Sequence, residues 1–425
     1  MTTLLIEGGH RLSGRVHVEG NKNAALPILA ACLLTSEECV ITNMPRIRDV
    51  EVMAQLLVDL GAEVDGVGTT TFRVRCPEIV KDEPDPVLVG RLRGSVLLLG
   101  PLLARRGCAR LAPPGGDFPA RRSLAIHLEA LAAMGARTVP GAGYHLEVPD
   151  GLQPASIYLI EASVTGTETA ILAGAAAPGR SEIRHAACEP HVVELCEFLA
   201  QLGLPITGAG TSTIRIDGGG KLGGAAHRLW GDYIEAGSWA VVAAVTGGEI
   251  EVSGARPEDM EVIAAVFERL NLECGMDGET LRIERSRPRT PVGPGPAGRR
   301  LTTGLWPGFP SDLVSLVTVL ATQVDGRTLV HDWLYELRLF ALEQLSGMGA
   351  ELFLCDPHRI IVTGPRRLNG RTLDSRDLRS GMALIAAALA ADGESRLMPL
   401  ETVERGYGQL VERLQELGAR VERQT

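Results

Sequence analysis

The sequence is poor in aromatic residues, which make up 4% of its 425 residues. The core must therefore be built from Ala, Leu, Val and Ile, within an apolar fraction of 45%. Charged residues contribute 22%, an ordinary globular balance that argues against a disordered or fibrous chain. A chain of this length is too long for one ordinary core, so two domains are expected.

An excess of positive charge is also lacking. The formal net charge is −10, which argues against nonspecific nucleic-acid binding because such binding depends on surplus Lys and Arg. A locally basic cleft for an anionic substrate is still compatible with this total, since the field at a site depends on nearby charges.

Targeting and membrane segments are not expected either. No run approaches the roughly 20 apolar residues of a membrane span, and the start Met1–Glu7 lacks the basic and apolar stretches of a signal peptide. The eight cysteines form no CxxC pair, and most lie in apolar runs such as 29–33. This pattern favours buried thiols over disulfides or zinc ligands. We expect a cytosolic protein with no metal and no cofactor.

An internal repeat organises the chain. A turn resembling Leu-Gly-Ala recurs about every seventy residues, where a glycine suits the left-handed backbone that ends a helix. Asn271 occupies the sixth position, between the third and fourth glycines. The glycines are Gly61, Gly135, Gly203, Gly349 and Gly418.

Each repeat also contains an almost wholly apolar helix, which is typical of a helix buried on all sides. Alternating strands such as 249–252 and 327–330 follow these helices. The pattern predicts an α/β fold of six units in two domains, with sheets outside and helices inside. The predicted helices are 24–34, 95–104, 167–176, 238–245, 312–321 and 380–391.

The glycine-rich stretch 217–228 lacks the spacing of a phosphate-binding loop, so we interpret it as a hinge or loose connection. The domain boundary is expected there. We assign residues 21–230 to one domain, and residues 1–20 with 231–425 to a second, discontinuous domain. The Pro-rich segment 287–300 interrupts a repeat and is interpreted as an exposed loop within a domain.

Charged residues gather at the starts of the apolar helices. Lys22, Arg93 and Arg379 occupy such positions, together with Asp312 and Asp377. Helix N-termini favour anions, and the added cations strengthen that preference. Singly, such an arginine is usually a surface residue and such an aspartate a helix cap. The pattern Leu-Arg-Gly-Ser at 92–95 nevertheless returns as Leu-Arg-Ser-Gly at 378–381, which favours a shared anion site.

The segment 113–122, Pro-Pro-Gly-Gly-Asp-Phe-Pro-Ala-Arg-Arg, combines prolines and glycines between a strand and a helix. Such a composition predicts a mobile loop that could act as a lid, although an exposed turn would have the same composition.

These segments together resemble the enolpyruvyl transferases from residue 8 to residue 422, and within them the enzymes that act on UDP-N-acetylglucosamine. The family fold is two inside-out α/β barrels, each of three βαβαββ-type units. The resemblance implies phosphoenolpyruvate and UDP-N-acetylglucosamine as substrates, peptidoglycan synthesis as the pathway, and no nucleic-acid or obligate protein partner. Its most specific motifs are Lys-Asn-Ala-Ala-Leu-Pro at 22–27, Leu-Arg-Gly-Ser at 92–95, Pro-Gly-Gly-Asp at 114–117, Phe-Pro-Ser-Asp at 309–312, Asp-Leu-Arg at 377–379 and Glu-Arg-Gly-Tyr at 404–407.

The resemblance also implies residue roles. Lys22, Arg122 and Arg405 match the cations around the phosphate of phosphoenolpyruvate, and Arg379 with Arg338 would neutralise its carboxylate. Asp117 stands where the family usually has a cysteine, which is the acid that protonates the substrate carbon. Asp312 matches the aspartate beside the sugar hydroxyl and is our candidate base. The remaining candidate substrate-binding residues are Asn23, Arg93, Ser163, Val164, Leu334 and Asp377.

The acceptor side departs from the family pattern. Ala125, Glu161 and Thr165 replace the usual aspartate, lysine and glycine, while His191 and Leu337 replace glutamate and asparagine. Two alternatives therefore stay open beside the peptidoglycan enzyme: a paralogous enolpyruvyl transferase with another acceptor, and a non-catalytic relative that binds ligand. Because a carboxylate is a weaker nucleophile than a thiolate, Asp117 also predicts resistance to the epoxide fosfomycin.

Overall fold

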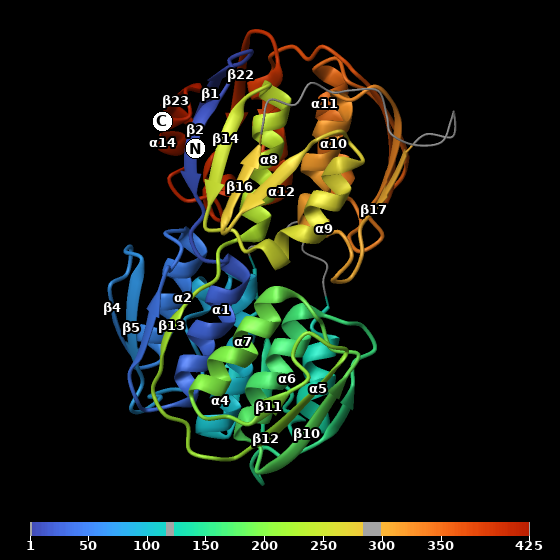
Figure 1. Ribbon diagram of the computed structural model, residues 1–425. Coiled ribbons are helices and arrows are strands. Elements are labelled where there is room, and N and C mark those ends of the chain that lie inside the picture. The colour runs from blue at the N-terminus through green and yellow to red at the C-terminus, as the bar shows by residue number, and fades with distance from the viewer. Residues whose placement is uncertain (1, 116–122, 284–298, 425) are drawn as a thin grey trace. The chain divides into compact units, whose positions relative to one another are not determined.

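The computed structural model describes residues 2–115, 123–283 and 299–424. The chain divides into two compact units. The inserted unit is Gly20–Trp230, and the discontinuous unit combines Met1–Glu19 with Gly231–Thr425. In Figure 1 the inserted unit runs from blue to green, and the discontinuous unit holds the first strands and the yellow to red elements.

The inserted unit alternates strands and helices along the chain. Its strands are β3 (Cys39–Thr42), β4 (Glu63–Asp65), β5 (Thr71–Arg75), β6 (Cys108–Leu111), β7 (Arg137–Thr138), β8 (Tyr144–Glu147), β9 (Ser156–Tyr158), β10 (Gly179–Arg184), β11 (Ile206–Thr207), β12 (Thr213–Gly218) and β13 (Ala226–Arg228). Its helices are α1 (Lys22–Ala31), η1 (Cys32–Leu34), α2 (Arg48–Asp59), α3 (Pro86–Val89), η2 (Arg93–Leu98), α4 (Leu99–Arg106), α5 (Ala125–Ala133), α6 (Val164–Ala176) and α7 (Pro190–Gln201).

The described strands of this unit form three sheets, with the orders β13-β3-β5-β4, β6-β8-β7 and β11-β12-β10-β9. The first and third of these sheets each contain a parallel pair, β13 with β3 and β9 with β10. In the β6-β8-β7 sheet the corresponding edge is occupied by the segment around Asp82, whose carbonyl accepts a hydrogen bond from Arg110 N at 2.8 Å. Each sheet is therefore one repeat of the same plan.

The discontinuous unit follows that plan with strands from both ends of the chain. Its strands are β1 (Thr3–Glu7), β2 (Ser13–His17), β14 (Glu249–Ser253), β15 (Cys274–Asp277), β16 (Thr280–Ile283), β17 (Arg299–Thr302), β18 (Gly326–His331), β19 (Glu351–Asp356), β20 (Arg359–Gly364), β21 (Thr372–Asp374), β22 (Glu394–Met398) and β23 (Arg420–Gln424). Its helices are α8 (Tyr233–Thr246), α9 (Pro257–Glu268), η4 (Ser311–Leu313), α10 (Val314–Thr322), η5 (Arg338–Glu343), α11 (Gln344–Gly347), α12 (Leu378–Ala390), α13 (Glu401–Glu404) and α14 (Leu410–Glu416).

The N-terminal strands complete two of the three sheets found in the described part of this unit. Strand β1 lies between β22 and β23, and β2 pairs in parallel with β14, giving the orders β21-β22-β1-β23 and β15-β16-β14-β2. The third sheet has the order β17-β18-β20-β19. Because Thr3 is the partner of Gln424, the two ends of the chain lie side by side, as the N and C marks in Figure 1 indicate.

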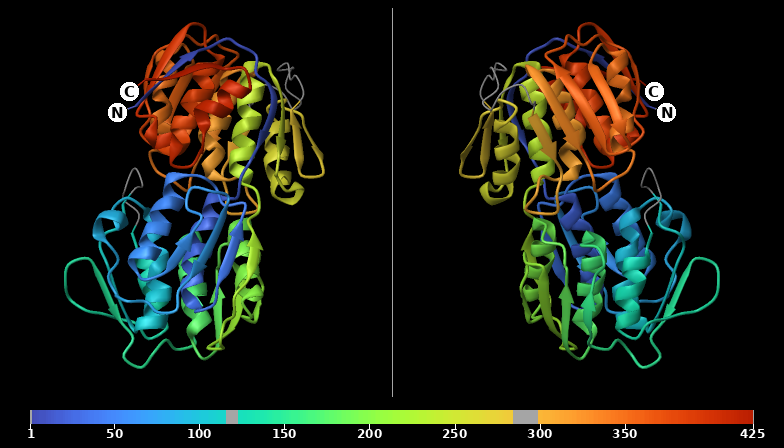
Figure 2. Two further views of the ribbon diagram at one scale, coloured as in Figure 1. Left: turned by 90° about the vertical axis from the view of Figure 1, so that its left-hand side faces the viewer. Right: turned by 90° about the vertical axis from the view of Figure 1, so that its right-hand side faces the viewer.

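Apolar helices fill the centre of each unit, and the strands lie toward its outside (Figure 2). Helices α1, α4 with η2, and α6 hold the core of the inserted unit, and α8, α10 and α12 hold that of the other. Close packing of α4 on α6 uses Gly100, where an added Cβ would lie 3.0 Å from Leu172 Cβ. The predicted two-domain α/β fold with helices inside is confirmed.

The turns that end the repeats explain the recurring glycine. Gly61, Gly135, Gly203 and Gly349 have φ between +95° and +104°, and Gly418 has φ +90°. At the sixth position Asn271 adopts φ +57°. Asparagine tolerates this left-handed conformation better than most residues, so it can replace glycine there.

The two segments predicted as loops have different outcomes. The glycine-rich stretch 217–228 lies within the inserted unit, where it joins β12 to β13, and the units divide just after it, at Trp230. Most of segment 287–300 lies outside the described residues, and its last two residues begin β17.

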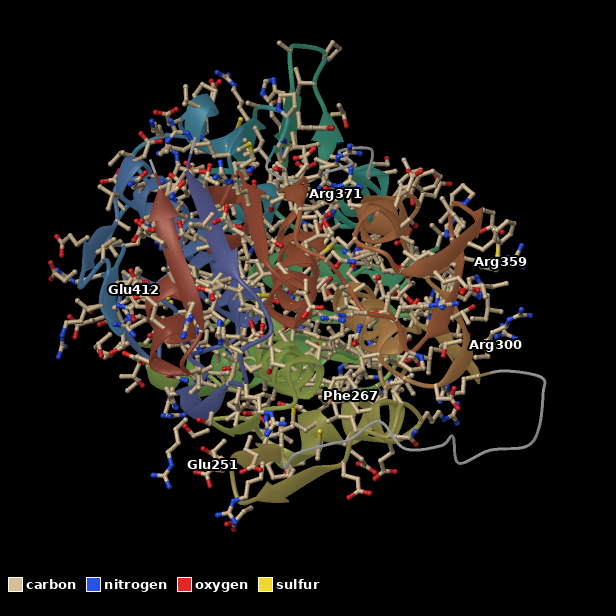
Figure 3. All side chains as sticks on the ribbon, turned by 90° about the horizontal axis from the view of Figure 1, so that it is seen from above. Glu251, Phe267, Arg300, Arg359, Arg371 and Glu412 are labelled. Atoms are coloured by element: carbon tan, nitrogen blue, oxygen red, sulfur yellow. The ribbon has the colours of Figure 1, made fainter. Side chains whose placement is uncertain are left out.

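Side chains of the discontinuous unit follow the alternation expected of half-buried strands. Figure 3 labels Arg300 and Arg359, which point away from their sheet, whereas Phe267 of α9 is fully buried. Among the described residues, no helix has the length and apolar character needed to cross a membrane.

Candidate active site

The start of α12 carries a capped, buried arginine in the discontinuous unit. Asp377 caps the helix, and its Oδ1 accepts hydrogen bonds from Arg379 N at 2.9 Å and Ser380 N at 3.0 Å. The cap turns the chain so that Arg379 lies in the first helical turn, with only 6% of its surface exposed. A guanidinium held at a helix N-terminus and shielded from water is suited to binding an anion.

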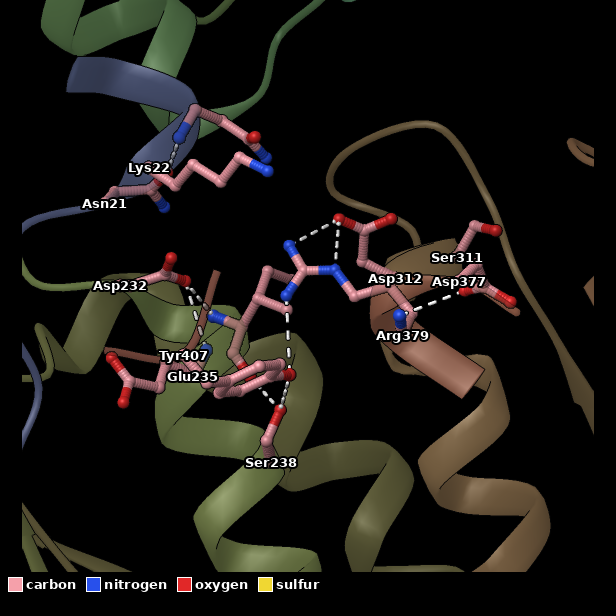
Figure 4. A network of polar contacts seen from close by, with 12 residues as sticks. Asn21, Lys22, Asp232, Glu235, Ser238, Ser311, Asp312, Asp377, Arg379 and Tyr407 are labelled. Carbon is pink, nitrogen blue, oxygen red and sulfur yellow. Dashed lines mark hydrogen bonds and ion pairs between the residues drawn. The ribbon is translucent and has the colours of Figure 1, made fainter. Parts of the chain in front are cut away.

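Asp312 lies between two arginines, as Figure 4 shows for Arg379. Its Oδ2 is 2.8 Å from Arg379 Nη2 and 3.1 Å from Arg379 Nε. Its Oδ1 is 3.1 Å from Arg338 Nη1. Each carboxylate oxygen therefore has its own guanidinium, so the sequence-predicted residues Asp312, Arg338 and Arg379 do form one cluster.

Both arginines of this cluster remain charged despite burial. Burial opposes the charge on Arg379, but Asp312, Tyr407 and Asp232 outweigh it and raise the pKa of the guanidinium. For Arg338 burial is again the largest effect, and Asp312 leads the acidic groups that raise its pKa. The cluster thus holds two permanent cations that share Asp312, with Asp232, Asp332 and Asp377 nearby, so an incoming anion would have to compete with carboxylates of the protein.

A second layer of hydrogen bonds fixes Arg338 and Arg379. Arg338 Nη1 donates to Ser311 Oγ at 2.8 Å, and Ser311 in turn donates to Asp332 Oδ2 at 2.7 Å. On the other side Arg379 Nη1 lies 3.4 Å from the hydroxyl of Tyr407, which is 2.8 Å from Ser238 Oγ. These buried partners restrict where the two guanidinium groups can point.

Two further predicted residues lie near this cluster along the chain. Leu334 N donates to Asp332 Oδ1 at 3.3 Å, which places Leu334 in the loop after β18. Arg405 is half-buried at the C-terminal end of α13, two residues before Tyr407. Leu337, a departure from the family pattern, immediately precedes η5 and has φ +66°.

In the inserted unit, Lys22 and Asn23 begin α1. Asn21 caps that helix by accepting a hydrogen bond from Asn23 N at 2.7 Å. Lys22 Nζ lies 2.7 Å from Asp49 Oδ2 of α2, and both side chains are largely buried. The structure therefore gives this predicted cation an internal carboxylate partner that the sequence did not indicate.

Helices α5 and α6 bring a neutral cluster together around His127. Its Nδ1 lies 2.9 Å from Thr169 Oγ1, and its Nε2 lies 3.2 Å from Thr165 Oγ1. Burial, aided by the charge of Arg93, lowers the pKa of His127 to about 4. The imidazole is therefore neutral at physiological pH.

The other predicted acceptor-side residues surround this cluster. Ser163 caps α6 by accepting a hydrogen bond from Gly166 N at 3.2 Å, and Val164 is the first residue of the helix. Arg93 Nη2 lies 3.4 Å from the carbonyl of Ser123. Thr165, which departs from the family pattern, thus has a defined role as a partner of His127.

Sequence reasoning missed several of these groups. Asp332 and Asp49 support the candidate residues but lie in none of the motifs, and Tyr407 lies in the motif at 404–407 without having been assigned a role. Glu168 was hidden inside a helix predicted to be almost wholly apolar, yet it is 1% exposed. Its burial and the nearby Glu189 raise its pKa well above the ordinary value. Asp117 and Arg122 lie outside the described residues.

Comparison with known proteins agrees with this fold. The family model described as EPSP synthase (3-phosphoshikimate 1-carboxyvinyltransferase) matches residues 6–414. The chain therefore belongs to this family and is an enolpyruvyl (1-carboxyvinyl) transferase. The enolpyruvyl transferase NikO from Streptomyces tendae superposes with a TM-score of 0.88 at 25% identity, covering 100% of this chain and 99% of that one. An EPSP synthase from Acinetobacter baumannii, at 18% identity and TM-score 0.77 over the full length of both chains, shares the fold.

Within the family, the chain is similar to proteins named UDP-N-acetylglucosamine 1-carboxyvinyltransferase. The one from Bradyrhizobium diazoefficiens is 42% identical over 421 residues, covering 99% of this chain and 97% of that protein. The one from Treponema denticola is 40% identical over 423 residues, covering 99% of both.

Proposed function

We propose that this chain transfers the enolpyruvyl group of phosphoenolpyruvate to the 3-hydroxyl of UDP-N-acetylglucosamine and releases phosphate. The observation that carries the proposal is full-length identity of about 40% to relatives bearing that name, joined to two buried arginines gathered around Asp312. The reaction would begin peptidoglycan synthesis, and so contribute to cell shape and division. We place it in the cytoplasm, the compartment of both substrates.

The donor carboxylate is proposed to bind Arg379 with help from Arg338. In the described structure both guanidinium groups face Asp312 instead. An incoming carboxylate that replaced Asp312 on Arg379 would receive the same charged hydrogen bonds. It would also free Asp312 Oδ2 to accept a proton, so donor binding would prepare the base.

The phosphate of the donor is proposed to bind Lys22, Arg122 and Arg405. For Lys22 this requires the phosphate to share the ammonium group with Asp49, or to replace it. Asn23 would contact the donor and the intermediate. Arg93, Ser163 and Val164, together with Leu334 and Asp377, are the remaining proposed substrate contacts. We also propose that the segment around Asp117, which belongs to the domain of residues 21–230, acts as a lid.

The proposed chemistry needs one base and one acid. Asp312 accepts the proton of the sugar hydroxyl while the hydroxyl oxygen forms a bond to the central carbon of phosphoenolpyruvate. Asp117 gives a proton to the methylene carbon, so a tetrahedral intermediate with a methyl group forms. That methyl group then returns a proton to Asp117 as the carbon–oxygen bond to phosphate breaks. The products are the enolpyruvyl ether and inorganic phosphate.

An acceptor panel tests the proposal directly. Phosphate release from phosphoenolpyruvate should require UDP-N-acetylglucosamine and should not occur with UMP, with shikimate 3-phosphate, or without acceptor. The same panel with Asp117→Asn and Asp312→Asn should show loss of turnover in both variants. Full turnover in both would overturn the assignment of acid and base.

A second candidate function is transfer to another nucleotide or sugar. It is favoured by Glu161 and Ala125 on the acceptor side, and by the use of Thr165 as a partner of His127. Phosphate release with a different acceptor, and none with UDP-N-acetylglucosamine, would establish it. No release with any acceptor would instead favour a ligand-binding role. Retention of Lys22, Asp312 and Arg379 speaks against that outcome.

Resistance to fosfomycin is a separate test of the lid position. Wild-type activity should survive incubation with the epoxide, because a carboxylate attacks it far more slowly than a thiolate. Asp117→Cys should make the enzyme sensitive. Stoichiometric labelling of Asp117 with loss of activity would refute this expectation.

A further inference from the structure

The β6-β8-β7 sheet of the inserted unit brings together three side chains of types that bind metals. The ligand atoms of Cys108, His145 and Glu147 all lie within 4.8 Å of one another. His145 Nε2 is 3.6 Å from Cys108 Sγ and 3.2 Å from Glu147 Oε1. Thiol, imidazole and carboxylate are each common ligands of zinc.

Strand register places these residues on one face of the sheet. Cys108 of β6 is the direct partner of Glu147 of β8, and Arg110 is the partner of His145. The alternate residues Ala109 and Leu146 are buried in the core. Since side chains alternate along a strand, the ligand set lies on the opposite, solvent-facing side of the sheet.

The spacing of the donor atoms suits a tetrahedral ion. Bonds of about 2.0–2.3 Å to zinc at tetrahedral angles put neighbouring donors about 3.3–3.7 Å apart. The separations of 3.6 Å and 3.2 Å lie close to this range. Only small rotations of these partly buried side chains would then be needed to close the site.

Asp82 of the neighbouring segment lies beside this set and would supply a fourth donor after a rotation of its side chain. Its Oδ2 lies 3.1 Å from Cys108 Sγ, while the backbone pairing with Arg110 holds this segment against β6. Two carboxylates, those of Asp82 and Glu147, lie beside the sulfur, and negative charge there favours a cation.

Arg110 is the group that opposes metal binding. Its Nε lies 3.5 Å from His145 Nε2 and 3.6 Å from Asp82 Oδ2, and its side chain is half exposed. An arginine at such a position can turn toward solvent, which would leave the carboxylate and the imidazole to a metal ion. Its removal should therefore strengthen binding.

We propose that Cys108, His145 and Glu147, with Asp82 in the fourth position, form a binding site for Zn²⁺ that is separate from the transferase chemistry. On binding, the thiol loses its proton to solvent as the sulfur–metal contact forms. A bound ion would join β6, β8 and the segment at Asp82. It would therefore stabilise the inserted unit in proportion to its occupancy.

Titration of the metal-free full chain with Co²⁺ tests the site. We expect one Co²⁺ per chain, with a thiolate-to-metal charge-transfer band in the near ultraviolet that Zn²⁺ abolishes by displacement. The band should be lost in Cys108→Ser. His145→Gln should weaken binding at least about tenfold. Cys355→Ser, which removes the exposed cysteine of the discontinuous unit, should bind like wild type.

Two further measurements keep the test independent of misfolding. Zn²⁺ should raise the Tm of wild type by a few degrees but leave that of Cys108→Ser unchanged. Arg110→Ala should bind Co²⁺ more tightly than wild type. Absence of the band in wild type, its retention in Cys108→Ser, or weaker binding by Arg110→Ala would each overturn the proposal. Transferase activity in saturating substrates should be the same with and without Zn²⁺.

Discussion

The Asp312 cluster of the discontinuous unit and the His127 cluster of the inserted unit both lie at the starts of buried helices, yet they differ in charge. The first holds two arginines and a carboxylate in ion pairs. The second holds a neutral imidazole between two threonine hydroxyls. The charged cluster consists of residues that match the family motifs, and the neutral one includes Thr165, which does not.

This difference indicates where the chain has freedom to change. Loss of one partner from a buried ion pair leaves an uncompensated charge, which is strongly destabilising. A single substitution within the Asp312 cluster is therefore costly. A neutral hydrogen-bonded cluster accepts substitution at lower cost. Substitutions are therefore easier to accommodate around His127 than around Asp312.

The largest expected effect is on turnover, from Asp312→Asn. The amide cannot accept the proton of the sugar hydroxyl, so kcat should fall about 10²- to 10⁴-fold. Steady-state phosphate release measures this. Asp374→Asn, which changes an exposed acid of β21 paired with Arg376, should retain wild-type rates. A decrease of less than about tenfold in Asp312→Asn would remove Asp312 from the role of base.

The next effect concerns stability in acid, which is expected to differ between the two units. His127 has a folded-state pKa of about 4, below its ordinary value of 6.5, so the unfolded chain binds the proton more readily. Stability should therefore fall as pH decreases from about 6.5 to 4, by about 3 kcal/mol in all. Urea denaturation across this range measures the loss, and His127→Gln should flatten it.

Asp259 of α9 provides the opposite case in the discontinuous unit. Burial raises its pKa to about 6, with Arg256 opposing and Glu258 adding to the shift. The folded state holds the proton more tightly, so this contribution to stability is lost as pH rises from about 4 to 6. Hydrogen exchange in α5, which carries His127, and in α9 should therefore respond to pH in opposite directions. A common response would contradict the contrast.

A smaller effect is expected from Tyr407→Phe. The variant removes the hydroxyl that contacts Arg379 and Ser238, while Ser238 keeps its hydrogen bond to the carbonyl of Ile234 at 2.7 Å. Stability should fall by about 1 kcal/mol. The KM for phosphoenolpyruvate should rise a few-fold with kcat nearly unchanged, if Tyr407 only orients Arg379. A large fall in kcat would point to a direct part in the reaction.

The smallest predicted change is a gain from Leu337→Asn. Leu337 adopts φ +66° and is 38% exposed, so it bears a left-handed backbone conformation with little compensation from burial. Asparagine relieves this strain, and the free energy of unfolding should rise by about 0.5 kcal/mol. Leu337→Ala is the matched control, since its Cβ keeps the conflict. Equal midpoints in urea for Asn and Ala would contradict the explanation.

The repeat could be predicted from the sequence because its signals are local. A glycine in a left-handed turn and a wholly apolar helix are each visible within a dozen residues, and Asn271 fits the same turn. The exchange of strands could not be predicted in this way. Pairing of β1 with β22 joins residues almost 400 positions apart, and no local pattern specifies it.

The candidate site was predictable to the same extent. Arg379 and Asp377 were visible as helix-start residues, because capping follows from adjacent positions. The Lys22–Asp49 ion pair and the group at Cys108 were not, since they depend on helix packing and strand register. Motifs therefore located the charged residues, whereas their internal partners required the structure.

The interrupted path of the discontinuous unit has a consequence for synthesis on the ribosome. Asn21 N is hydrogen-bonded to Trp230 O, so the inserted unit is closed upon itself and complete once residue 230 has emerged. Strand β1 must then wait for β22 and β23, the last strands to be translated. Until termination the nascent chain carries an unpaired leading strand, and slowed elongation after residue 230 would lengthen its exposure to chaperones and to other nascent chains.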